Sequence, residues 1–413
     1  MAPLKLLSII LAASFVVGEI VRLELMPNLF IKPLDITVGI ISVFGIIQLI
    51  IFKKVDLLYT DKIFRSVLLF FLIGFISLIF NSGNLSLEEF VSSFLYGVRF
   101  VSYAFLFMII KNVKYSLINS TVYMFLTAGI VLLVFGFVQY LFYSDLRNLY
   151  YLGWDEHMYR LFATFLDPNF AGAFFVLFFT FVSGLFFYSL QNKKTFLKNF
   201  TIFIMCMALI SIYLTFSRSA LTMLFISSFV FLVLIKKLKL MFVLIAVSLV
   251  FFVISSKNFH IENVNPFRFA SIEARLDSAK IAINIIRKNS ILGVGFNSYR
   301  YAQIRYGFRD KENAIKSYAD ASSDNSFLFV LATTGVVGLL AYLYLLYSII
   351  KSAYLKYKKL KTSTLSYFLS VVVIASFIGI IVDSLFINSL FYSFSMLWFW
   401  IILGLWSRDD ISL

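Results

Sequence analysis

Polar residues that could bind phosphate or carry a proton stand at a few points in a very apolar sequence. Arg218 lies between two hydrophobic runs, 201–216 and 219–235. An arginine at bilayer depth costs about 3 kcal/mol on insertion scales, so such residues usually face a protein interior or a wet cavity and mark a functional site. The alternative is that Arg218 ends one span and extends to the membrane interface. The immediate return to apolar residues, with no other charge nearby, favours the interior site.

Other candidate residues flank the apolar runs. They are Arg160, Asp167 and Asn169 before the run 170–190, Arg275 in a long polar segment, and Asp324 and Asn325 before the run 326–350. Arginine binds phosphate and diphosphate through bidentate, charge-assisted hydrogen bonds. A carboxylate near such a site can act as a general base on a hydroxyl.

Each of these residues also has a structural interpretation. Asp324 or Asn325 could cap the helix that follows, a common role for both residue types. Asp167 followed by proline fits a helix start. Arg275 alone could be a solvated helix residue. A shared location at one membrane face is what favours the functional interpretation.

The composition indicates a polytopic membrane protein. The chain has 413 residues, of which 61% are hydrophobic and 14% are charged, against about 25% charged in soluble domains. The net charge of +15 does not indicate nucleic-acid binding, because the lysines and arginines gather in short breaks between apolar runs. Such a distribution is typical of signals that orient membrane spans.

A transmembrane helix needs about 20 mostly apolar residues, and the sequence predicts twelve. The predicted spans are 4–21, 32–52, 64–80, 90–110, 120–143, 170–190, 201–217, 219–235, 239–256, 326–350, 366–386 and 389–406. Glu19 and Arg22 at the end of the first run, with no small-residue cleavage site, favour a retained span over a signal peptide. The pair around Arg218 is the weakest part of the count, because almost nothing separates the two runs.

The basic residues also predict the orientation of the chain. Five breaks hold two or more lysines or arginines, and with twelve spans all five fall on one side: 52–65, 111–119, 191–199, 236–239 and 351–361. The break 81–89 on the other side holds Glu88 and Glu89 but no basic residue. The excess of basic residues predicts that both termini are cytoplasmic.

The two long segments on the outer side are 144–169 and 257–325. Within the second, apolar residues at spacings of three and four predict an amphipathic helix over 271–288, with Ile272, Leu276, Ala279, Ile283 and Ile286 on its stripe. That stripe could lie on the bilayer surface or against the bundle. We expect one transmembrane domain, 1–413, with 257–325 as an extracytoplasmic loop inserted between spans nine and ten.

No cofactor or metal site is predicted. The sequence has no GxxxxGK[ST] or GxGxxG motif. Its two histidines, His157 and His260, are far apart, and no Cys/His cluster has metal-ligand spacing. The single cysteine, Cys206, excludes an intramolecular disulfide.

Three local patterns, in order over about 155–340, resemble the O-antigen polymerase and O-antigen ligase superfamily of bacterial membrane glycosyltransferases. The first is the stretch from Arg160 to Asn169, and the second is Phe216-Ser217-Arg218-Ser219. The third runs from Arg275 through Leu292-Gly293-Val294-Gly295 to Asp324-Asn325-Ser326-Phe327-Leu328, with Gly335 and Gly338 beyond. Two positions depart from the family pattern: Asp324 stands where the ligases usually have a histidine, and Ser219 replaces a glycine. The missing histidine favours a polymerase over a ligase of the lipid A core.

The resemblance implies an all-α enzyme of the C-type glycosyltransferase kind, active at the outer face of the bacterial cytoplasmic membrane. Its substrate would be an undecaprenyl-diphosphate-linked oligosaccharide, polymerised into O-antigen, capsule or exopolysaccharide without a bound metal. Arg218 and Arg275 would neutralise the diphosphate leaving group, and Asp324 would act as a base, ionised with a pKa lowered by the arginines. Arg160, Asp167, Asn169 and Asn325 would bind substrate.

Two alternatives remain from the sequence: a ligase that transfers finished glycan to lipid or protein, and a transporter or flippase of lipid-linked sugars. The absence of visible repeat symmetry disfavours the transporter. The expected partners are the lipid-linked substrate and the bilayer, with a chain-length regulator and a flippase as further candidates and no nucleic acid.

Overall fold

The computed structural model describes residues 2–26, 29–113, 118–152, 155–258, 264–265, 269–310 and 321–408. His260 lies outside the described residues. The chain is 78% helical with almost no sheet, so the predicted class, a polytopic all-α membrane protein, is confirmed.

Every predicted span is occupied by a helix. In chain order these are α1 (Ala2–Val17), α2 (Pro33–Ile51), α4 (Lys62–Phe80), α5 (Leu87–Asn112), α6 (Ile118–Phe142), α7 (Pro168–Gln191), α8 (Thr195–Leu214), α9 (Arg218–Leu234), α10 (Met241–Ser255), α14 (Ser326–Lys359), α15 (Leu365–Asp383) and α16 (Ser393–Trp406). Within the described residues, nine helices are long and apolar enough to cross a membrane, and three shorter apolar helices fall in α1, α9 and α16. The exact number of spans therefore stays a prediction.

The two runs around Arg218 form separate helices. α8 ends at Leu214, and Phe216 takes a left-handed backbone conformation with φ of 48°. A non-glycine residue rarely adopts this conformation, and it cannot continue a right-handed helix. The hydroxyl of Ser217 then caps α9 by accepting from the backbone N–H of Ala220 at 3.4 Å. A turn of three residues thus sets Arg218 at the first position of α9.

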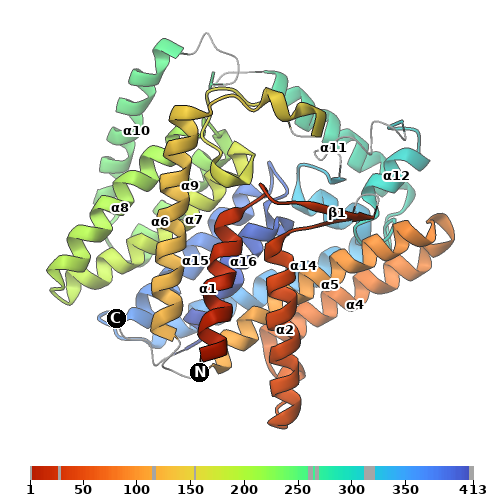
Figure 1. Cartoon of the computed structure of the whole chain (residues 1–413), viewed down its shortest axis with the longest axis horizontal. Coiled ribbons are helices and arrows are strands. Elements are labelled where there is room, and N and C mark those ends of the chain that lie inside the picture. Colours follow the sequence, from red (N-terminus) through yellow and green to blue (C-terminus); the bar gives the residue numbers. More distant parts are fainter. Residues whose placement is uncertain are drawn as a thin grey trace.

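The centre of the bundle is formed by α7 and α15, whose side chains are mostly buried. α15 packs against both α9 and α7, and α16 packs against α5. Aromatic rings fill the interior around the buried Trp398, which meets Phe174 edge-on with ring centroids 5.2 Å apart. By contrast, α10 lies at the periphery beside α8 with most of its side chains exposed (Figure 1).

A short antiparallel hairpin, not predicted from the sequence, joins α1 to α2. Its strands are β1 (Leu23–Met26) and β2 (Leu29–Ile31). The small helical elements are α3 (Leu57–Thr60), α12 (Tyr299–Arg305), and the 3-10 turns η1 (Ser82–Asn84), η3 (Arg147–Leu152), η4 (Ala163–Phe165), η5 (Leu238–Leu240), η6 (Ser256–Asn258) and η9 (Ser389–Phe391). The predicted amphipathic helix is α11 (Ala270–Lys288).

A kink at Gly335 in α14 forms the docking site for the chain that follows α11. Gly335 has φ of 67°, and a Cβ there would lie 2.0 Å from the carbonyl oxygen of Ile291, so only glycine fits. Near the kink, the N–H groups of Val294 and Gly295 donate to the carbonyls of Ala332 and Thr333, each at 3.0 Å. These bonds fix the C-terminal end of α11 against α14.

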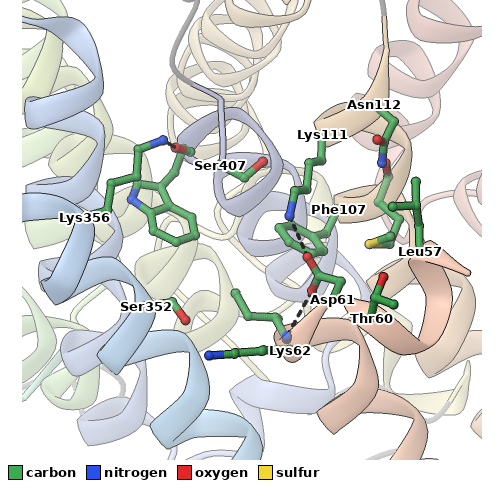
Figure 2. A pocket seen from close by; sticks show the side chains of 13 residues that line it. Leu57, Thr60, Asp61, Lys62, Phe107, Lys111, Asn112, Ser352, Lys356 and Ser407 are labelled. Atoms are coloured by element: carbon green, nitrogen blue, oxygen red, sulfur yellow. Dashed lines mark hydrogen bonds and ion pairs between the residues drawn. The ribbon is translucent and has the colours of Figure 1, made fainter.

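The N-terminal end of α1 and the C-terminal end of α16 lie toward one end of the bundle, and α11 lies toward the other (Figure 1). At the first end, lysines from three of the predicted cytoplasmic breaks, Lys62, Lys111 and Lys356, line one cavity of about 410 Å³. Figure 2 shows Lys111 directed toward Asp61, which it contacts at 2.6 Å. Three of the five basic breaks that the sequence assigned to one side therefore meet at one end of the molecule.

Candidate functional site

One face of α11 is turned toward the bundle, and it differs from the predicted apolar stripe. Ala282 and Ile285 are buried, and they form a small core with residues of α12 and α14. Ile272, Leu276 and Ile283 of the predicted stripe are 42%, 57% and 41% exposed instead. Ile286, at the end of the same stripe, packs against the small core, so the stripe lies only partly against the bundle.

The inward face of α11 brings Arg218, Arg275 and Asp324 together. The guanidinium of Arg218 donates a hydrogen bond to Ser271 Oγ at the start of α11. The backbone N–H of Asp324 donates to Ser278 Oγ at 3.2 Å. Arg275 lies four residues after Ser271 and three before Ser278, so all three share one helix face. Arg275 therefore lies between the other two predicted catalytic residues, and its charge acts on both.

The structure separates the roles of Asp324 and Asn325. Asn325 caps α14, because its Oδ1 accepts from the N–H groups of Phe327 at 2.8 Å and Leu328 at 3.0 Å. Its amide nitrogen also donates to the carbonyl of Leu385 at 3.1 Å. Asp324 is not the cap, so the structural interpretation fits Asn325 alone.

Arg275 lowers the pKa of Asp324 as expected, but the net pKa is raised rather than lowered. Burial raises the pKa of this carboxyl to about 6, and Arg275 only partly opposes that rise. The negative charges of Asp155 and Asp167 raise the pKa further. Asp324 is therefore ionised at neutral pH but is a stronger base than an ordinary aspartate, which suits a general base.

Arg160 and Asn169 hold the turn that begins α9. Arg160 is buried, and its Nε donates to the carbonyl of Thr215 at 2.7 Å while Nη2 donates to Asn169 Oδ1 at 3.3 Å. The hydroxyl of Ser217 donates to the same Asn169 oxygen at 3.0 Å. Arg160 and Asn169 thus hold the turn from which α9 begins at Arg218.

Asp167 caps α7, as its sequence context suggested. Its Oδ1 accepts from the N–H groups of Asn169 at 2.6 Å and Phe170 at 3.2 Å. Burial alone would raise the pKa of Asp167, but His157 and these two N–H groups outweigh burial, so the net pKa is lowered. The other carboxylate oxygen lies 3.9 Å from His157 Nε2.

Two features of the site were missed in the sequence. Asp383, at the C-terminal end of α15, is fully buried and accepts a hydrogen bond from the hydroxyl of Ser389. The charges of Arg275 and Asp167 both act on it. An acidic residue inside the apolar run 366–386 was the signal that could have found it. The second feature is a grouping of Asp155, His157 and Asp167 whose potential ligand atoms all lie within 4.8 Å of one another.

A second group of charges lies beside the hairpin. Arg99 pairs with Asp35 at 3.0 Å, and Tyr103 donates to the same carboxylate at 2.7 Å. Lys32 pairs with the buried Glu19. Each of these charges has an opposite partner, so this group explains how α1, α2 and α5 hold buried charges together.

An apolar cavity ends at Arg218. It has a volume of about 310 Å³, and its walls come from α8, α9 and α10, with Phe225, Leu249 and Phe252 among them. A second apolar cavity of about 210 Å³ lies among α7, α8, α9 and the segment 240–247. Among the residues that the structure describes, Arg218 is the only charged side chain lining either cavity. The peripheral α10 thus lies over apolar space that adjoins Arg218.

The fold and site define a multi-pass membrane protein that groups arginines and carboxylates at one end of an apolar bundle. Residues 200–343 match a family model described as O-antigen ligase. This match to part of the chain supports the resemblance to the O-antigen polymerase and ligase superfamily, whose members are glycosyltransferase-like enzymes acting on lipid-linked glycans. The matched segment holds Arg218, Arg275 and Asp324 but not the Arg160–Asn169 stretch. A search of curated proteins gave no match.

Proposed function

We propose that the protein polymerises undecaprenyl-diphosphate-linked oligosaccharide units into O-antigen, capsule or exopolysaccharide at the outer face of the cytoplasmic membrane. The observation that carries this proposal is the alignment of Arg218, Arg275 and Asp324 along the inward face of α11. The arginines repel each other, and a bound polyanion would relieve that repulsion. The ligase family match supports glycosyl transfer in general.

The donor would bind with its diphosphate at Arg218 and Arg275 and with part of its polyprenyl chain in the apolar cavity at Arg218. The cavity is lined by apolar side chains and ends at the guanidinium of Arg218. A lipid diphosphate likewise has an apolar chain joined to a charged group. The planar guanidinium gives bidentate hydrogen bonds to phosphate oxygens that lysine does not reproduce.

In the reaction, an acceptor hydroxyl attacks the anomeric carbon of the growing chain. The bond between that carbon and the diphosphate oxygen breaks, and undecaprenyl diphosphate leaves with the bonding electrons. Arg218 and Arg275 stabilise the charge that develops on the leaving group. Asp324 accepts the proton of the hydroxyl, and its raised pKa strengthens it for this step. Arg160, Asp167, Asn169 and Asn325 position the site through the contacts described above.

The ligase alternative has one observation in its favour, which is that the matched family model is described as O-antigen ligase. Deletion of the gene separates the two functions. A polymerase mutant should still build and export single repeat units but lack long chains. Long chains intact on the lipid carrier, with only their transfer to a final acceptor missing, would instead select the ligase.

The outer location of the site is tested separately by cysteine labelling in a Cys206→Ser background. A cysteine at Lys280 in α11 should react with an impermeant reagent added outside, and one at Lys361 should react only from the cytoplasm. Both positions are exposed. Reaction of position 280 only from the cytoplasm would overturn the proposed orientation.

A further inference from the structure

His157 is a buried imidazole whose nitrogens are not satisfied by the described residues. Its side chain is 7% exposed, and neither ring nitrogen has a hydrogen-bond partner among them. The distance of 3.9 Å from Nε2 to Asp167 Oδ2 is too long for a hydrogen bond. Leaving such a group without a partner is costly, so its presence requires an explanation.

The backbone holds His157 and Asp167 in place. The carbonyl of His157 accepts from the N–H of Leu146 at 2.8 Å, and the N–H of Tyr159 donates to Ser144 at 2.8 Å. Asp167 uses one carboxylate oxygen to cap α7 and presents the other to His157. The backbone at His157 and the carboxylate of Asp167 are therefore held in place before any ligand arrives, which is how effective binding sites are built.

Three carboxylates act on one another here, beside the positive charge of Arg275. Asp155 and Asp167 act electrostatically on each other, and both act on Asp324. Like charges in one site are unfavourable, and a diphosphate would add to the repulsion. A cation between Asp155 and Asp167 would offset it. Asp155 is exposed, so an ion could enter from solvent.

We propose that Asp155, His157 and Asp167 bind one divalent transition-metal ion of the Mn²⁺ or Zn²⁺ type. One imidazole nitrogen and two carboxylate oxygens, all within 4.8 Å of one another, form a mixed donor set that suits these ions better than Mg²⁺ or Ca²⁺. Three protein ligands leave coordination positions open to water or substrate. The site goes beyond the proposed glycosyl transfer and does not depend on it.

The test is Mn²⁺ binding to the full-length protein, purified in detergent through a tag without histidine and stripped with EDTA. Electron paramagnetic resonance of free Mn²⁺ gives the affinity and stoichiometry. We expect one ion per chain, and at least about tenfold weaker binding in Asp155→Asn and in His157→Gln. Glu156→Gln is the matched control, because Glu156 is an exposed neighbour outside the cluster, and it should bind like the wild type.

Thermal unfolding gives a second readout that does not involve activity. Mn²⁺ should raise the melting temperature of the wild type and of Glu156→Gln, but not that of Asp155→Asn, since an ion that binds only the folded state stabilises it. Asp155 is exposed, so its variant should fold even if His157→Gln does not. Absence of binding to the wild type, or equal binding by Asp155→Asn, would overturn the proposal.

Discussion

Replacing Asp324 by asparagine should make the protein more stable and much less active. The side chain of Asp324 caps no helix, because Asn325 does. The contact that Asp324 makes with Ser278 uses its backbone N–H, which the substitution keeps. The variant therefore loses the carboxylate charge and little else.

The size of the stability gain follows from the pKa of Asp324. Its rise from the usual 3.8 to about 6 corresponds to up to about 3 kcal/mol, at about 1.4 kcal/mol for each pH unit. Because the folded-state pKa is the higher one, the folded protein binds more protons between the two values. The contribution of Asp324 to stability is thus most favourable below pH 3.8 and declines as the pH rises. Above about pH 6 the full cost of burying the ionised carboxylate is present. The asparagine variant avoids this cost at neutral pH.

The assay compares melting temperature and in vitro polymerisation of the same purified samples at pH 8, with EDTA present during unfolding. Asp324→Asn should melt at a higher temperature than the wild type and lose activity by about a hundredfold or more. Asp310→Asn, an exposed aspartate outside the site, should change neither. A variant that melts higher but polymerises normally would remove Asp324 from the chemistry, and one that melts lower would refute the electrostatic reasoning.

Three further outcomes follow from the same geometry. Arg218→Lys should fold, since lysine keeps the charge, yet lose most polymer because it lacks the bidentate fork; normal chain lengths in vivo would contradict this. The polymerisation rate of the wild type should fall as pH decreases through about 6, where Asp324 becomes protonated, and a rate unchanged between pH 5 and pH 8 would count against a carboxylate base. Gly335→Ala should lower the melting temperature sharply, because the added Cβ would lie 2.0 Å from the carbonyl oxygen of Ile291. The control Gly39→Ala should melt within a few degrees of the wild type, because a Cβ added at Gly39 would point into open space.

The helices of the bundle were predictable because a membrane demands long apolar runs with internally satisfied backbones. Arg218 was identified because it is a charged residue between two such apolar runs. The spacing of apolar residues in 271–288 predicted α11. The inward face of α11 was not predictable in the same way. Its buried positions are set by the docking of residues 290–295 onto the kink at Gly335, a tertiary contact that the apolar pattern does not encode.

The family pattern named residues that the structure brings together around α11, but it did not predict their environments. Asp324 would cap α14 if the helix began one residue earlier, and Asn325 caps it because the helix begins at Ser326. Sequence patterns do not locate the first residue of a helix that accurately. The pKa of Asp324 depends on burial by distant segments rather than on its neighbours in the chain. His157 lies near Asp167 because its backbone and that of Tyr159 pair with Leu146 and Ser144, contacts that the residue spacing alone did not indicate.

The most direct test of the central claim is extension of a purified lipid-linked repeat unit by the purified protein. The wild type should produce a ladder of longer glycans that remain attached to undecaprenyl diphosphate, with one undecaprenyl diphosphate released for each bond formed. Arg275→Gln, which keeps α11 but removes the charge between Arg218 and Asp324, should produce neither the ladder nor the released lipid. An identical ladder from Arg275→Gln, or a folded wild type that extends nothing, would contradict the account.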